Sequence, residues 1–96
     1  MKKFNISGMF SFYYIKDDNN ISFWYEGFGI EFRAESINDA KENVLKTVFD
    51  YAHNFINSLD TIDLHSVIHL NIELWYLRDD EDFNNSFKYP DVPDRF

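Results

Sequence analysis

The sequence predicts an α+β fold in which one long helix packs on one face of a four-stranded antiparallel sheet. Apolar and polar residues alternate over most of the first 34 residues and again over residues 68–77, which is the period of two of a β-strand. Between these regions the apolar residues recur every three or four positions, as on one face of a helix. Because an apolar helix face and half-apolar strands bury each other, the expected order is β-β-β-α-β.

Three antiparallel strands are expected before the helix. The first covers residues 4–15, with its even-numbered residues on the core face, and the turn-forming segment KDDNN follows at residues 16–20. One face of the second strand holds Ile21, Phe23 and Tyr25. The glycines at positions 27 and 29 would then permit a tight reversal into a third strand that ends at Ala34.

The helix is expected to begin after Ser36 and to end near Leu59. Ser36 suits the N-cap position, and Asp39, three residues on, is placed to reach back to it. Acidic side chains in this first turn also suit the positive end of the helix dipole. A helix of this length spans roughly 34 Å at about 1.5 Å per residue, which is enough to cross a small sheet diagonally.

The fourth predicted strand covers residues 68–77, and an irregular acidic segment follows it. Residues 79–96 show no period, contain both prolines, and carry six acids against two bases. Apolar side chains are nevertheless scattered through this segment: Phe83, Phe87, Tyr89, Val92 and Phe96. We therefore expect a single domain at residues 1–78 and a C-terminal arm at 79–96. The arm would dock on its own domain, which is the favoured interpretation, or on a partner.

The junction AESINDAKENV resembles the helix start of the HicB-like antitoxins. Ala34, Ser36, Asp39 and Ala40 match the pattern of small and acidic residues at that point, and the similarity covers residues 3–76. The resemblance implies a β-β-β-α-β fold. This chain departs from the family in the turn YEGFG and in its acidic end, where the family often has a DNA-binding segment. No functional residue is transferred.

Charge and composition indicate the kind of partner. Seventeen acidic against nine basic residues give a formal charge of -8, so the chain should repel nucleic acids and attract basic proteins. The absence of cysteine excludes disulfides, thiolate nucleophiles and cysteine-ligated zinc. No apolar run is long enough to span a membrane or to form a signal peptide. We expect a cytoplasmic protein, in the host cytoplasm if a phage encodes it, with no membrane partner.

No constellation of residues points to catalysis, a metal or a cofactor. His65, His69 and Glu73 would share one face of a strand but lie about 13 Å apart end to end, too far for one ion. The run DDED lacks the spaced ligands and the glycine of a calcium loop. No GxSxG turn or glycine-rich phosphate loop is present, so we expect a protein that is not an enzyme.

Two sets of residues are candidates for partner binding. If the even positions of the first strand face the helix, aromatic side chains should stand on the opposite face of the sheet and near its last strand: Tyr13, Trp24, Trp75 and Phe83. The acidic candidates lie in the first turn and directly after the last predicted strand: Asp17, Asp18, Asp79, Asp80, Glu81 and Asp82. The open alternative for the aromatic face is that the C-terminal arm covers it.

The sequence therefore favours a non-enzymatic inhibitor of a nucleic-acid-binding host defence system, of the anti-CRISPR or anti-restriction type. Its carboxylates would imitate phosphates on the basic surface of a nuclease or nucleoprotein complex, and its aromatic residues would anchor the complex. An antitoxin or immunity protein that neutralises a basic nuclease would use the same physics. The third hypothesis is a homo-oligomeric structural domain, such as a homodimer, that buries the aromatic face against itself.

Overall fold

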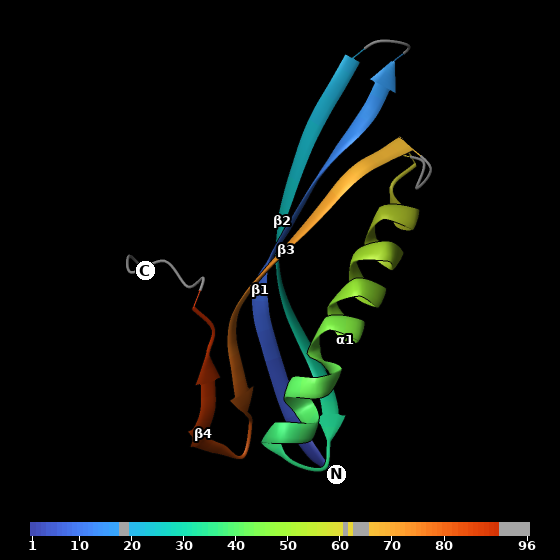
Figure 1. Cartoon of the computed structure of the whole chain (residues 1–96). Helices are drawn as coiled ribbons and strands as arrows, with labels where there is room; N and C mark the ends of the chain where they lie inside the picture. The colour runs from blue at the N-terminus through green and yellow to red at the C-terminus, as the bar shows by residue number, and fades with distance from the viewer. Residues whose placement is uncertain (18–19, 61, 63–65, 91–96) are drawn as a thin grey trace.

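The computed structural model of the protein describes residues 1–17, 20–60, 62 and 66–90. These residues form four strands and one helix: β1 (Lys2–Asp17), β2 (Asn20–Ala34), α1 (Ile37–Ser58), β3 (Val67–Asp79) and β4 (Asp82–Lys88). All neighbouring strands are antiparallel, in the order β2-β1-β3-β4, and α1 packs on one face of the sheet (Figure 1). The predicted α+β class, with a four-stranded antiparallel sheet and one helix, is confirmed.

The order of the elements is β-β-α-β-β and differs from the predicted order. The expected reversal at Gly27 and Gly29 is absent, because β2 continues through both glycines and pairs with β1 from Asp17↔Asn20 to Lys2↔Ala34. Neither glycine has a positive φ, so both hold an ordinary extended backbone. A reversal there would have left half of β1 without this partner, whereas one long hairpin gives β1 hydrogen-bond partners along the whole of this side.

The helix begins as the sequence predicts. Ser36 is the N-cap, and its side-chain oxygen accepts a hydrogen bond from the backbone N–H of Asp39 at 3.2 Å. The Asp39 carboxylate accepts from the N–H of Glu35 at 2.9 Å, one residue before the predicted partner Ser36, and the two side chains together fix the chain as it leaves β2. Leu59 is the C-cap. No helix in the described ranges is long and apolar enough to cross a membrane.

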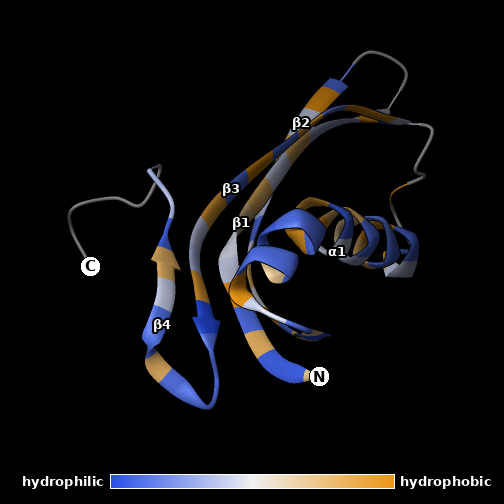
Figure 2. Ribbon diagram, turned by 60° about the horizontal axis from the view of Figure 1, so that its bottom comes forward, coloured by the Kyte–Doolittle hydropathy of each residue, from blue (hydrophilic) through white to orange (hydrophobic). Residues whose placement is uncertain are grey.

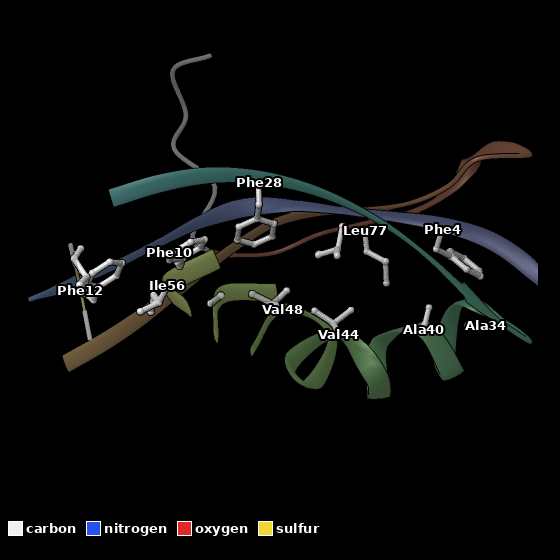
Figure 3. Packing of buried hydrophobic residues seen from close by; sticks show 13 residues of the cluster. Phe4, Phe10, Phe12, Phe28, Ala34, Ala40, Val44, Val48, Ile56 and Leu77 are labelled. Carbon is white, nitrogen blue, oxygen red and sulfur yellow. The ribbon is translucent and has the colours of Figure 1, made fainter. Parts of the chain in front are cut away.

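The core lies between α1 and the sheet face that it covers. Every fourth residue of the helix is buried: Ala40, Val44, Val48, Ala52 and Ile56. Against this row pack the even-numbered aromatic residues of the hairpin, including Phe4, Phe10, Phe12 and Phe28 (Figure 3). Phe10 is fully buried and lies 5.4 Å, between ring centroids, from Phe55 in an edge-on contact. The predicted core face of the first strand is therefore confirmed.

β3 changes the side of its side chains at a β-bulge, which the sequence pattern did not reveal. Its pairing with β1 shifts between Ser7 and Gly8, so that Tyr76 lies opposite Ser7 but Leu74 lies opposite Gly8. One extra residue reverses the alternation beyond the bulge. Leu77 is consequently fully buried in the core, whereas an uninterrupted alternation along β3 would point it away from the helix.

The segment expected to be an irregular arm contributes a strand. β4 pairs with the end of β3, and it forms the edge of the sheet opposite β2 (Figures 1 and 2). Phe87 and Tyr89 pack against the core, and the Lys41 ammonium of α1 lies 4.0 Å from the centre of the Phe87 ring. This part of the arm therefore docks on its own domain. Val92 and Phe96 lie outside the described residues.

Candidate partner-binding surfaces

Large apolar side chains gather on the bare face of the β1–β2 hairpin, opposite the helix. They are Tyr13, Ile15, Ile21, Phe23 and Tyr25, which we call the hairpin surface, and their exposed fractions lie between 45% and 66%. The Tyr13 and Phe23 rings are 5.0 Å apart between centroids, and the Phe23 and Tyr25 rings are 5.9 Å apart. The outer end of this hairpin extends past α1 and the start of β3 (Figure 1). Solvent-facing apolar side chains in one contiguous group are unusual and typical of interfaces.

The register of the hairpin decides which residues reach this surface. Tyr13 lies opposite Phe23 and Phe12 lies opposite Trp24, so odd-numbered residues of both strands share the outer face. The sequence did not predict that Phe23 and Tyr25 are exposed, because the two glycines indicated two short strands in place of one long β2. The signal was available, since one uninterrupted strand that places Phe28 in the core must also turn residue 23 outward.

The same register moves Trp24 to the helix side, which corrects its predicted outward position. Trp24 packs against the core, its ring centroid lies 6.3 Å from that of Phe55, and its indole N–H donates to the Glu26 carboxylate at 3.1 Å. Trp75 lies at the β3 bulge and is half-buried. Its backbone carbonyl accepts a hydrogen bond from the N–H of Tyr89 at 2.8 Å. Of the predicted aromatic anchors, Tyr13 and Phe83 are exposed.

The acidic run lies at the β3–β4 turn, and its first acid, Asp79, has a structural role inside the protein. Asp79 is fully buried, which corrects its expected surface position. Its carboxylate accepts hydrogen bonds from the Glu81 backbone N–H at 2.9 Å and the Asn85 amide at 3.1 Å, and the Lys2 ammonium lies 3.6 Å away. Hydrogen bonding from Glu81, followed by that from Asn85, lowers the pKa of Asp79 below its ordinary value even though burial opposes this. Asp79 therefore holds the turn together.

The remaining acids of the run are exposed and form what we call the acidic turn: Asp80, Glu81 and Asp82. Phe83, 79% exposed, stands directly beside them. The backbone of the turn is tied to the start of β1, since the N–H of Asp80 donates to the carbonyl of Lys3 at 3.0 Å. Asp17 is the last residue of β1, and Asp18 lies outside the described residues.

The two candidate surfaces lie at opposite ends of the sheet. Asp79 pairs with Phe4 near the start of β1, whereas Tyr13 is nine positions further along the same strand. At about 3.3 Å per residue the acidic turn and the hairpin surface are roughly 30 Å apart. The structure therefore brings Phe83 beside the predicted acids of the turn but keeps Tyr13 and the rest of the hairpin surface apart from them, and only an extended partner would touch both surfaces.

A shallow cleft of roughly 280 Å³ lies between the second half of α1 and the start of β3. Phe49, His53, Ile68 and His69 contribute to its lining, and the Phe49 and His53 rings meet edge to edge with centroids 5.6 Å apart. Among the described residues no group of three or more histidines and carboxylates is placed to hold a metal ion. His65 lies outside those residues.

The fold is thus an α+β sandwich of one helix on an antiparallel sheet, with an exposed aromatic hairpin and an acidic turn. Comparison with protein-family models, with curated proteins and with solved structures gives no match. The resemblance to the HicB-like antitoxins therefore stays a prediction.

Proposed function

We propose that this protein is a non-enzymatic inhibitor that binds a basic, nucleic-acid-binding protein, such as a nuclease or nucleoprotein complex, and that the hairpin surface is its anchor. The observation that supports the proposal is the exposure of Phe23 and Tyr25 together with Tyr13 on a face that α1 leaves bare. Tyrosine and other aromatic side chains are enriched among residues that dominate binding energy, because they bury a large area at small entropic cost.

The net charge of -8 favours a partner whose binding surface is positively charged. Electrostatic attraction mainly raises the association rate, whereas buried aromatic contacts slow dissociation. At physiological salt, interactions between exposed charges are screened beyond about 8 Å, so the acidic turn acts only on a partner that reaches it. A partner surface of about 800 Å² is close to 30 Å across, so only a partner that lies along the length of the sheet reaches both surfaces.

The proposed division of labour leads to a test with two matched variants. The tagged protein is used to capture proteins from a lysate of the cells in which its gene occurs. Binding of each captured basic protein is then measured with purified components. The double substitution Phe23→Ser with Tyr25→Ser should weaken binding at least about a hundredfold, as expected for loss of two central aromatic anchors. The triple substitution Asp80→Asn, Glu81→Gln and Asp82→Asn should lower the association rate and its dependence on salt.

Asp79 is left intact in the triple variant because its removal would disturb the turn itself. The proposal also requires that the captured protein lose nucleic-acid binding or cleavage when this protein is added. Capture of acidic proteins only, or equal affinity of the serine variant and the original protein, would refute it. If the captured partner is a toxin whose gene neighbours the gene of this protein, the inhibitor is an antitoxin or an immunity protein.

A further inference from the structure

We propose that two copies of this chain pair through β2, antiparallel and edge to edge, about a twofold axis at Tyr25. β2 is an edge strand of the sheet, and it runs for 15 residues from Asn20 to Ala34. A long edge strand presents backbone N–H and C=O groups that another strand can use. The pairing is independent of the proposed inhibitory function and would hold for any partner.

The edge of β2 lacks the features by which proteins usually protect such strands. Between Ile21 and Ile30 there is no proline, and the pairing with β1 over these residues is regular. The only charged residue in that stretch is Glu26, whose carboxylate accepts the hydrogen bond from the Trp24 indole. In a chain of charge -8, this edge is thus a place where two copies meet with little repulsion.

Side-chain size along the outer face of β2 is self-complementary. The outward residues are, in order, Ile21, Phe23, Tyr25, Gly27 and Gly29, so two large side chains precede Tyr25 and two residues without side chains follow it. Reversal of the strand about Tyr25 places Phe23 opposite Gly27 of the second copy and Ile21 opposite Gly29. Each large side chain then fills the space that a glycine leaves open, which is the kind of cross-strand packing that stabilises sheets.

Neighbouring registers are less favourable. A twofold axis at Glu26 would set that carboxylate directly opposite its own copy, and like charges in that position destabilise a strand pair. An axis at Trp24 would oppose Phe23 to Tyr25 on both sides of the axis, so that two pairs of large side chains would face each other, and only Gly27, opposite Ile21, would be filled. The axis at Tyr25 keeps the two Glu26 carboxylates apart, opposes only one pair of large side chains, Tyr25 with its own copy, and fills both glycines.

Edge pairing joins the two sheets into one antiparallel sheet of eight strands, with both helices on the same face. The symmetry is closed, so the contact ends at a dimer and gives no fibre. The hairpin surfaces of the two copies become neighbours on the opposite face and stay accessible. A dimer would therefore offer a partner two adjacent anchors.

Glycine substitution tests the packing without harming the monomer. A Cβ at Gly27 would have its nearest neighbour at 3.9 Å, and valine is well suited to strands, so Gly27→Val should fold as well as the original protein. It would, however, occupy the space required by Phe23 of the second copy and should raise the dissociation constant of the dimer by about tenfold or more. Asn71→Thr, on the outer side of β3, is the control and should leave the dimer unchanged. Analytical ultracentrifugation over a concentration series measures both.

The absence of cysteine makes single-cysteine variants a direct test of register. Tyr25→Cys would place two thiols opposite each other on the axis and should form an intermolecular disulfide on mild oxidation. Phe23→Cys would separate the two sulfurs by four residues, roughly 13 Å along the strand, well beyond the reach of a disulfide. A monomer at all concentrations, a dimer that Gly27→Val does not weaken, or equal crosslinking of the two cysteine variants would overturn the proposal.

Discussion

Gly8 of β1 lies so close to the backbone carbonyl of Glu73 in β3 that no Cβ fits between them. The close approach occurs where the pairing of β1 with β3 shifts at the bulge. A Cβ at this position would also lie 2.8 Å from Cζ of Phe28, a core ring. The packing of the sheet at its centre therefore depends on a residue without a side chain.

Gly8→Ala should destabilise the fold, since the obstruction includes backbone and cannot be relieved by a side-chain rotation. We expect a loss of at least ~2 kcal/mol in the free energy of unfolding, measured by urea denaturation. Gly29→Ala is the matched control in dilute protein, because a Cβ there has its nearest neighbour at 4.0 Å. That substitution should be neutral or stabilise by about 0.5 kcal/mol. Equal losses in the two variants would contradict this account of the bulge.

Asp79 should make the free energy of unfolding fall as the pH is lowered. Its pKa is lowered in the folded state, so the carboxylate contributes stability above its ordinary pKa of 3.8, and the contribution disappears as the pH falls through the lower folded value. Asp79→Asn should reduce stability at pH 7 and flatten the fall in the urea midpoint between about pH 5 and pH 2. Asp80→Asn, on the exposed neighbour, should leave the slope as it is. An unchanged slope in Asp79→Asn would show that the carboxylate is not held as described.

Substitution by threonine should have a large effect on stability at Trp24 and a small one at Tyr25, because these adjacent residues of β2 lie on opposite faces of the sheet. Trp24→Thr removes a ring packed against the core and should cost ~2–3 kcal/mol. Tyr25→Thr removes a ring that is 66% exposed and should change the monomer's stability by less than about 0.5 kcal/mol. Urea denaturation of dilute protein measures both values. A larger loss for Tyr25→Thr would reverse the assignment of the two faces.

Contact between α1 and β4 should depend on Lys41. Its ammonium lies over the Phe87 ring, so Lys41→Met should cost about 0.5–1 kcal/mol and should speed hydrogen exchange at the Tyr89 amide, which is bonded to Trp75. Lys46→Met changes an exposed lysine of the same helix and serves as the control. If exchange at Tyr89 were equally slow in both variants, the lysine would not be what holds β4 in place.

Sequence patterns alone determined the class of fold and the best-defined local features. The helix start at Ser36 and the core face of β1 follow from interactions within a few residues, a cap and a strict alternation, which any tertiary arrangement would preserve. The exposure of Tyr13 follows from the same alternation.

Only the tertiary structure decided the strand order and which side chains of β2 and β3 are buried, because local periodicity does not determine how distant strands pair. β1 is long enough to pair with β2 without a break at Gly27 and Gly29 of β2. This pairing places Trp24 on the helix side of the sheet and Phe23 on the opposite face. A single extra residue at the β3 bulge buried Leu77. The fold also buried Asp79, whose carboxylate has partners in the turn (Glu81), in β4 (Asn85) and in β1 (Lys2). Charge and composition predict a basic partner, whereas the register of the sheet decided which aromatic residues are exposed.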